Sequence, residues 1–264
     1  MTTVHEVHAH NTATRSENAM HHDDVARRYG FRGGLVPGVD VYAYLTNPPA
    51  QRWGATWLER GRMQGRFLKP VYDGDVVQVL ATDGPEGSLT LEVRDGEGER
   101  CAAGTASLPD RPPPPPDPAA WPLVDPPVAD DRPPAGPDTL AAGTPLALAP
   151  HRFSSAAADG YLREVRETLP LYADAGVAHP GWLLRDANAV LWRSVRMGPW
   201  IHVESDAQHL GLVRDGDLVS CRATVTREWE RKGHRFVELD VLHLADDRPV
   251  ARVTHTAIHT PRSG

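Results

Sequence analysis

The sequence lacks long apolar runs and is poor in cysteine. None of its 264 residues falls in a segment that approaches the roughly 18 consecutive apolar residues needed to span a bilayer. The first residues, Met-Thr-Thr-Val-His-Glu-Val, also lack the cationic stretch and apolar core of a secretory signal. We therefore expect a cytoplasmic protein that does not bind a membrane. The two cysteines, Cys101 and Cys221, are then expected to be small buried side chains and not a disulfide.

Positive charge is also scarce. The chain has 28 Lys and Arg against 35 Asp and Glu, for a net charge of −7 and a pI near 6.0. A nucleic-acid partner is not expected, because nucleic acids select a basic surface. Aromatic residues make up only 6% of the chain, and many of the 25 prolines lie between residues 109 and 145. This stretch favours polyproline II, so we predict a linker at 109–145 between an N-terminal unit, 1–108, and a C-terminal unit, 146–264.

The two units share an internal repeat. Three short matches recur in the same order at nearly constant spacing: Pro37-Gly38 with Pro180-Gly181, Trp57 with Trp200, and Asp73-Gly74-Asp75 with Asp215-Gly216-Asp217. Matches of this kind indicate a duplicated unit. In each unit the first match begins an apolar helical segment, and turn signals then separate stretches with strand composition. Each unit is therefore predicted to be one helix followed by four strands.

Local signals predict the bounds of these elements. Residues 4–14 alternate in polarity and predict a strand, and Asp23 or Asp24 is expected to cap a short helix that ends at Arg28. Pro48-Pro49 should end the first central helix, which starts at Val39. The further segments are expected at 57–71, 75–82, 88–94 and 101–108 as strands, at 181–196 as the second central helix, and around 227–234 as a longer hairpin in the second unit.

The most informative stretch runs from Ser16 to Gly38. Its core, Asn18-x-x-His21-x-Asp23, is followed by Ala26, by Gly30-Phe31 and by a glycine that begins a helix. This pattern resembles the hydratase motif of MaoC-like (R)-specific enoyl-CoA hydratases and dehydratases. The resemblance implies an α+β double hot-dog fold, in which two copies of a central helix wrapped by a curved antiparallel sheet form one continuous sheet. Residues 159–164, at the matching place in the second unit, lack the motif, so one active site per chain is expected.

The motif departs from the family at three positions. The family reads Asp-x-Asn-Pro-x-His and has a His-Gly step before the central helix, whereas this chain has Ser16 in place of the Asp, Ala19 in place of the Pro, and Pro37 before Gly38. A serine hydroxyl cannot act as a carboxylate base near neutral pH. We therefore expect a nearby acid to replace the Asp, with Glu17 first and Asp23 or Asp40 next.

The resemblance implies a hydro-lyase that acts on an enoyl or 3-hydroxyacyl thioester. His21 is the expected acid and base, Asn18 would hold the loop or the attacking water, and the Gly38 N–H would donate to the oxyanion. Glu17 and Asp40 complete the candidate catalytic set. No cofactor and no metal are implied. The expected partner is the thioester of CoA or of an acyl carrier protein, and the candidate substrate-binding residues are Ser16, Arg32, Pro37 and Tyr42.

Each residue also has a purely structural interpretation. His21 and Asn18 occur in a polar loop, where solvated imidazoles and turn-forming amides are common. Asp23 and Asp24 are well placed as helix caps, and Gly38 could allow a helix to pack closely on a sheet. The arginines of this stretch, Arg27, Arg28 and Arg32, could meet the phosphates of a carrier or form a solvated basic face.

Other functions stay open as well. Hot-dog thioesterases use a carboxylate on or near the central helix, for which Asp40 and Glu17 are the candidates, and the missing Asp allows a non-catalytic acyl-binding protein. A weaker hypothesis is a metal site formed by His8 and His10 with His21 or His22. The acyl group, the direction of the reaction and assembly into a homo-oligomer are left open.

Overall fold

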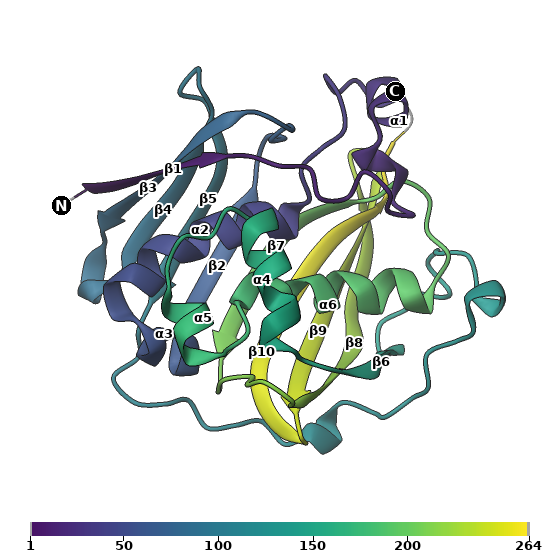
Figure 1. The fold of residues 1–264 in the computed structure, drawn as a ribbon. Coiled ribbons are helices and arrows are strands. Elements are labelled where there is room, and N and C mark those ends of the chain that lie inside the picture. The colour runs from purple at the N-terminus through teal and green to yellow at the C-terminus, as the bar shows by residue number, and fades with distance from the viewer. Residues whose placement is uncertain (1, 263–264) are drawn as a thin grey trace.

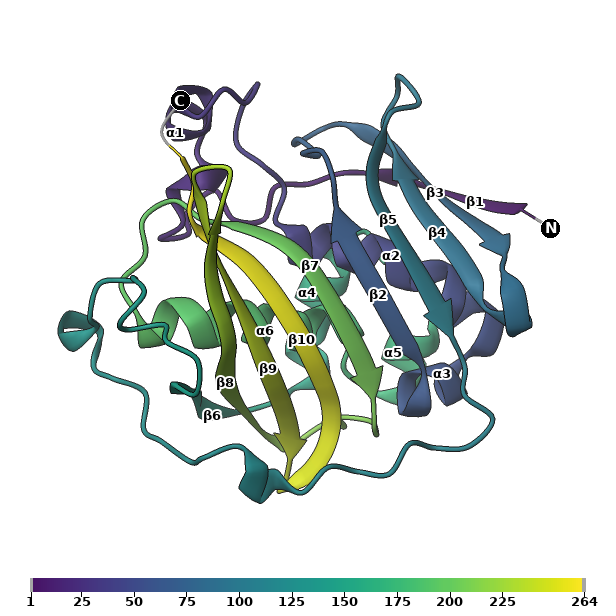
Figure 2. The same cartoon turned by 180° about the vertical axis from the view of Figure 1, so that it is seen from behind.

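Ten antiparallel strands form one sheet in the computed structural model, which describes residues 2–262 (Figures 1 and 2). They are β1 (Thr2–His8), β2 (Arg62–Phe67), β3 (Val76–Asp83), β4 (Leu89–Arg94), β5 (Arg100–Ser107), β6 (Pro145–Arg152), β7 (Ile201–His209), β8 (Leu218–Arg231), β9 (His234–Ala245) and β10 (Arg248–Thr260). Their order, β1-β3-β4-β5-β2-β7-β10-β9-β8-β6, is symmetrical about the contact between β2 and β7. The two halves therefore have the same topology, and the chain has the predicted double hot-dog fold.

The halves join through the edge strands β2 and β7. Backbone pairing extends from Arg62 opposite Gln208 to Arg66 opposite Glu204. Across this seam the Arg62 guanidinium also donates to both carboxylate oxygens of Asp206, at 2.8 and 2.5 Å. Because an exposed ion pair contributes at most about 1 kcal/mol, the backbone ladder is the main connection between the two halves.

Two central helices, α2 (Gly38–Trp53) and α6 (Pro180–Ser194), pack against each other on one face of the sheet (Figure 1). Every residue of α2 from Val39 to Ala50 is buried, as expected for a helix enclosed by a sheet and a second helix. The shorter helices are α1 (Asp23–Arg28), α3 (Ala55–Arg60), α4 (Ser155–Glu164) and α5 (Leu171–Ala175).

The first central helix is longer than predicted. Pro48 and Pro49 lie inside α2, which continues to Trp53. A proline inside a helix costs about 3 kcal/mol, but both rings are buried in the core, so tertiary packing offsets this local cost. The strand predicted at 57–71 is also wrong in its first part. Gly54, at φ 59°, ends α2, and the chain then forms α3 before β2 begins.

In each half four strands follow the central helix, as predicted, and a fifth strand precedes it. In the first half this strand is β1, predicted at 4–14 but ending at His8, and in the second half it is β6, which the sequence did not predict. Its Pro145 and Pro150 argue against a central strand, but β6 lies at the edge of the sheet, where a missing N–H is tolerated. The long hairpin predicted around 227–234 is confirmed, with Lys232 and Gly233 at positive φ between β8 and β9.

The proline-rich segment runs along the outside of the second half (Figure 2). The Trp121 ring is buried against Leu242 and Leu244, and its Nε1–H donates to the Asp240 carbonyl at 3.0 Å. Cys101 and Cys221 are free and buried, as predicted. No helix within residues 2–262 is long and apolar enough to cross a membrane.

Candidate active site

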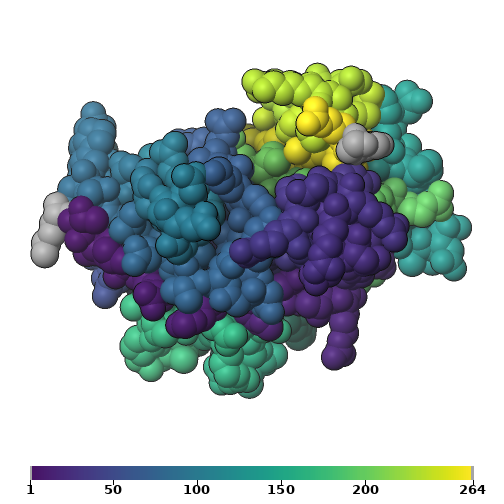
Figure 3. Space-filling model, turned by 90° about the horizontal axis from the view of Figure 1, so that it is seen from above, coloured from purple at the N-terminus to yellow at the C-terminus, as the bar shows by residue number. Residues whose placement is uncertain are grey.

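The predicted motif lies in the loop of residues 9–37, between β1 and α2, and this loop meets the second half of the chain. Viewed from above, its purple surface lies beside the yellow-green hairpin of β8 and β9 (Figure 3). Asn11 fixes the loop from inside, because its Nδ2–H donates to the His21 carbonyl at 3.0 Å. The site is therefore built at the junction of the two halves.

Asn18 uses its whole side-chain amide to hold this junction. Its Oδ1 accepts from the N–H groups of Met20 and Trp200, at 3.2 and 3.1 Å. Its Nδ2 group donates to the Trp200 carbonyl at 3.0 Å and contacts His21 Nε2 at 3.1 Å. All four hydrogen bonds that an amide can make are formed. Of the two roles expected for Asn18, this geometry favours holding the loop over holding a water molecule.

The His21 ring is held at both nitrogens. Its Nδ1 lies 2.7 Å from the Leu35 carbonyl, which can only accept, so Nδ1 carries the proton. In the neutral ring Nε2 then has the free lone pair and accepts from Asn18. Burial lowers the pKa of His21 and outweighs the opposing effects of the Leu35 carbonyl and of Asp40. At neutral pH the imidazole is therefore an uncharged base with a fixed tautomer.

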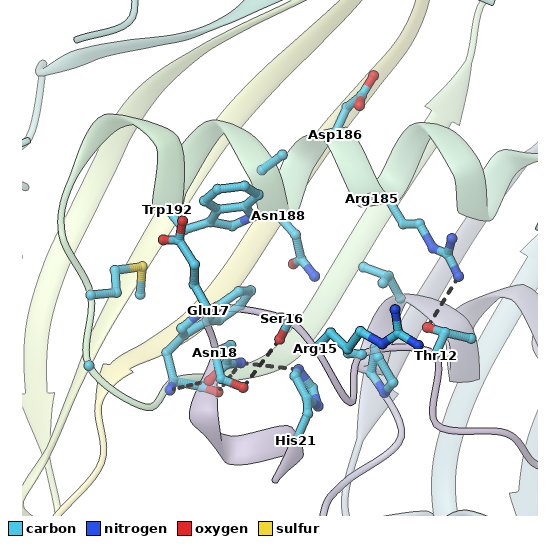
Figure 4. A pocket seen from close by; sticks show the side chains of 17 residues that line it. Thr12, Arg15, Ser16, Glu17, Asn18, His21, Arg185, Asp186, Asn188 and Trp192 are labelled. Atoms are coloured by element: carbon cyan, nitrogen blue, oxygen red, sulfur yellow. Dashed lines mark hydrogen bonds between the residues drawn. The ribbon is translucent and has the colours of Figure 1, made fainter. Parts of the chain in front are cut away.

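Two cavities meet at His21. The outer cavity, of about 510 Å³, lies between the loop and α6 (Figure 4). The inner cavity, of about 310 Å³, extends toward the sheet and is lined mainly by apolar side chains, among them Met20, Phe31 and Phe67. The residues that line both cavities are Asn18, His21, Pro37, Asn188 and Trp200. The junction thus combines an imidazole with groups from both halves.

The N-terminus of α2 borders the inner cavity at Gly38. The first N–H groups of the helix, those of Gly38 and Val39, have no hydrogen-bond partner inside the helix, because the residues four positions earlier precede it. A Cβ atom at Gly38 would lie 2.8 Å from His202 Nδ1 and 3.1 Å from His202 Cβ. Glycine is therefore required here, because the buried His202 ring occupies the space that a side chain would need.

Asp40 is fully buried, but its carboxylate is already paired. One oxygen accepts from Nη2 and Nε of Arg185, at 2.9 and 3.1 Å, and the other accepts from the Thr12 hydroxyl at 2.5 Å. Arg185 belongs to α6, so this ion pair links the two central helices. Asp40 does not line either cavity, and its contacts suit a structural link.

Glu17 and Ser16 line the outer cavity, but neither stands beside His21 as a free base. The Glu17 side chain is 65% exposed and accepts from Arg132 Nη1 at 3.1 Å. Arg132 also donates to the Trp192 carbonyl at 2.7 Å. Ser16 Oγ donates to the Asn18 carbonyl at 3.3 Å. The prediction that a carboxylate replaces the missing Asp therefore gains no support from the contacts of Glu17 or Asp40.

The other predicted site residues are spread more widely. Pro37 lines both cavities. Arg32 lines neither, since its guanidinium pairs with Asp75 at 2.5 Å and stacks on Tyr72. Tyr42 is completely buried, and its hydroxyl donates to the Met63 carbonyl at 3.4 Å, so it belongs to the core and not to a cavity wall. Asp23 accepts from the Gly34 N–H at 2.8 Å and shapes the loop.

The contribution of the second half to the site was not predicted from the sequence. Arg185, Asn188 and Trp192 extend from α6 into the outer cavity, and Trp200 and His202 approach from the segment around the start of β7. A signal was present, because Arg185, Asn188 and Trp192 are three and four residues apart and so share one face of the predicted helix. Their meeting with the loop could not be predicted, since it depends on how the halves pack. No group of three or more His, Cys, Asp or Glu side chains within residues 2–262 is placed to hold a metal ion.

Comparison with known proteins gives structural matches only. No family model and no curated protein sequence matches the chain. A solved structure assigned as a MaoC domain dehydratase, from Chloroflexus aurantiacus J-10-fl, superposes with a TM-score of 0.67 at 11% identity, over 100% of this chain and 95% of that one. A conserved hypothetical protein from Mycobacterium tuberculosis, described as a double hotdog fold, gives a TM-score of 0.66 at 15% identity, over 97% and 95% of the two chains.

The fold alone does not distinguish between reaction types. A structure described as an oleoyl thioesterase, from Lactobacillus plantarum, also matches, with a TM-score of 0.52 at 13% identity, over 99% of this chain and 98% of that one. The whole chain therefore resembles MaoC-like dehydratases and other hot-dog proteins in structure. The reaction has to be argued from the site itself.

Proposed function

We propose that this double hot-dog protein is a hydro-lyase that adds water to a 2-enoyl thioester, or removes it from a 3-hydroxyacyl thioester, with His21 as acid and base. The observation that carries the proposal is the state of the His21 ring. Its Nδ1–H donates to the Leu35 carbonyl, so Nε2 carries the basic lone pair at the junction of the two cavities, and the Asn18 amide that now donates to it must give way to the attacking water. A neutral base with a lowered pKa can accept a proton from water near neutral pH.

The N-terminus of α2 supplies the complementary charge. When water attacks Cβ of the enoyl group, the electron pair of the double bond moves to the thioester oxygen. The first N–H groups of α2, at Gly38 and Val39, can donate to this oxygen, and the helix dipole favours negative charge there. His21 then returns the proton to Cα. One water is added, and the imidazole ends the cycle neutral.

The cavities suggest how the substrate is oriented. The inner cavity has the apolar walls that suit an acyl chain. The outer cavity has a mixed lining whose polar side chains, among them Arg15 and Ser16, suit the polar carrier of a thioester. In this orientation the reacting carbons lie beside His21.

Hydration is favoured over thioester hydrolysis because, within residues 2–262, no unpaired carboxylate lines the junction. The candidate acids for hydrolysis, Asp40 and Glu17, are paired with Arg185 and Arg132. Hydrolysis by the hot-dog route would first require one of these ion pairs to break.

The test is the turnover of a short trans-2-enoyl-CoA, followed by loss of the enone absorbance and, in parallel, by a thiol assay. His21→Ala should lower kcat by on the order of a hundredfold or more. The matched control is His22→Ala, because His22 adjoins the base but lines neither cavity. Equal losses in the two variants would contradict the role of His21, and thiol release with the enone intact would indicate a thioesterase.

A further inference from the structure

Hydration by His21 leaves one problem, which is the second proton of the attacking water. His21 Nε2 accepts one water proton, but a water molecule is held in a fixed orientation only when its other hydrogen also has an acceptor. The family motif has a carboxylate for this purpose, and here the position is Ser16, whose hydroxyl already donates to the Asn18 carbonyl. A different acceptor must lie at the junction of the cavities.

The carboxylates of the site are unsuited to this task. Glu17 and Asp186 are the acids that line the outer cavity, and no acid lines the inner one within the described part of the chain. Glu17 is paired with Arg132. Asp186 contacts His151 Nε2 at 3.0 Å, and its carboxylate points away from the loop that carries His21 (Figure 4).

Asn188 is in a different situation. It lines both cavities, and its amide extends from α6 toward the loop with Ser16 and His21 (Figure 4). Its Oδ1 atom is buried and has no hydrogen-bond partner within residues 2–262. A buried amide oxygen without a partner destabilises the folded protein, because it has lost its hydrogen bonds to water. A water molecule or a substrate hydroxyl at the junction would remove this destabilisation.

We infer that Asn188 is the second catalytic group of the site and that its amide, supplied by the second half of the chain, replaces the carboxylate missing at Ser16. This inference rests on the proposed hydro-lyase function. The water replaces the Asn18 amide as the donor to His21 Nε2 and donates its other hydrogen bond to Asn188 Oδ1. As the oxygen attacks Cβ, the first proton moves to His21 and later to Cα, while the second stays on the new hydroxyl group. An amide can accept this hydrogen bond without taking the proton.

With Asn188 as the second group, the site has a single titrating base, His21. With a carboxylate partner, two titrating groups would share the water. With Asn188, His21 alone must be in its basic form, so kcat/KM should rise with pH through the lowered pKa of His21 and then stay level through neutral pH. Dehydration uses the same contacts in reverse, with Asn188 holding the hydroxyl group that leaves.

The experiment compares two variants of nearly the same size as asparagine. Asn188→Leu removes the acceptor, and Asn188→Asp keeps an acceptor and adds a charge. Hydration of a short trans-2-enoyl-CoA is measured against pH for both, with thermal unfolding as the check on folding. Asn188→Leu should lower kcat by about tenfold to a hundredfold, the effect of one hydrogen bond made to the reacting group. Asn188→Asp should stay within about tenfold of the natural protein.

The pH profile separates a catalytic from a structural role. A carboxylate at residue 188 stabilises the protonated imidazole, so the acidic limb of Asn188→Asp should move to higher pH. Unchanged kcat in a folded Asn188→Leu, or an acidic limb that does not move in Asn188→Asp, would overturn the inference while His21→Ala still tests the base. If neither the natural protein nor any variant hydrates the substrate, the proposed function itself fails.

Discussion

Acid should unfold this protein through its buried histidines. The imidazoles of His202, His209, His243 and His255 are among the side chains that are almost completely buried. Burial lowers the pKa of each, to about 4 for His209 and to about 3 for His255. The unfolded chain has the ordinary value near 6.5. Below that value the unfolded state binds more protons than the folded state, so stability is fully present above pH 6.5 and is lost as pH falls.

The expected magnitude follows from these groups. Each lowered histidine contributes a slope of about 1.4 kcal/mol per pH unit between 6.5 and its folded pKa. Four such groups give roughly 5–6 kcal/mol per pH unit. His151 acts in the opposite sense, because Asp186 raises its pKa, but its slope lies above pH 6.5 and does not reduce this value. A domain with about 5–15 kcal/mol of stability should therefore unfold cooperatively one to three pH units below 6.5.

Urea unfolding at a series of pH values from 7.5 to 4.5 measures this slope directly. His209→Asn keeps a donor for the Trp57 carbonyl, which His209 Nδ1 contacts at 2.9 Å, and removes one titrating group. The variant should lose about 1.4 kcal/mol per pH unit from the slope. A free energy of unfolding that does not change between pH 7 and pH 5 would refute the reasoning.

Two further substitutions test the packing around the site. Asp40→Ala leaves Arg185 without its buried partner and should lower the free energy of unfolding, measured in urea, by about 3 kcal/mol. Glu164→Gln removes the more exposed partner of Arg185 and should lower it by less than about 1 kcal/mol. Similar losses in both variants would contradict the structural role of Asp40. Gly38→Ala should lower the free energy of unfolding by about 1–3 kcal/mol, because its Cβ would contact His202 too closely. Gly160→Ala lies inside α4 with open space around it and should be neutral or stabilising by up to about 1 kcal/mol. A Gly38→Ala variant that is more stable than the natural protein would contradict this contact.

The fold could be predicted because the motif resembles that of a known family and because the repeat and the turns are visible as short stretches of sequence. Gly74 and Gly216 illustrate this: both have positive φ, at 78° and 86°, and each precedes an equivalent strand, β3 or β8. The two central glycines, Gly38 and Gly181, likewise lie at the start of helices. Local rules failed at Pro48-Pro49 and at β6, where burial and an edge position outweigh the usual effect of proline.

The candidate site was only half predictable, for a different reason. Asn18 and His21 lie in one loop, so a spacing pattern could indicate them. Asn188 and Trp200 reach the same place only after α6 and β7 have packed against the first half, and no spacing within the sequence encodes that contact. The same limit applies to Glu17 and Asp40, the carboxylates predicted to act with His21. Their adjacency to the motif was visible in the sequence, but the arginines that pair with Glu17 and Asp40 come from distant segments.

Duplication explains why one chain can place different groups on the two sides of one cavity. In a dimer of identical units, each central helix would have to contact the motif loop of the other unit and also support the motif loop of its own unit. Here the equivalent of Gly38 is Gly181, and a Cβ atom there would collide with the Tyr161 hydroxyl group and with Ala43. Tyr161, whose ring is buried, thus lies beside Gly181 as the buried His202 ring lies beside Gly38. The second half lacks the motif, and its helix instead presents Arg185, Asn188 and Trp192 to the cavity beside the loop of the first half.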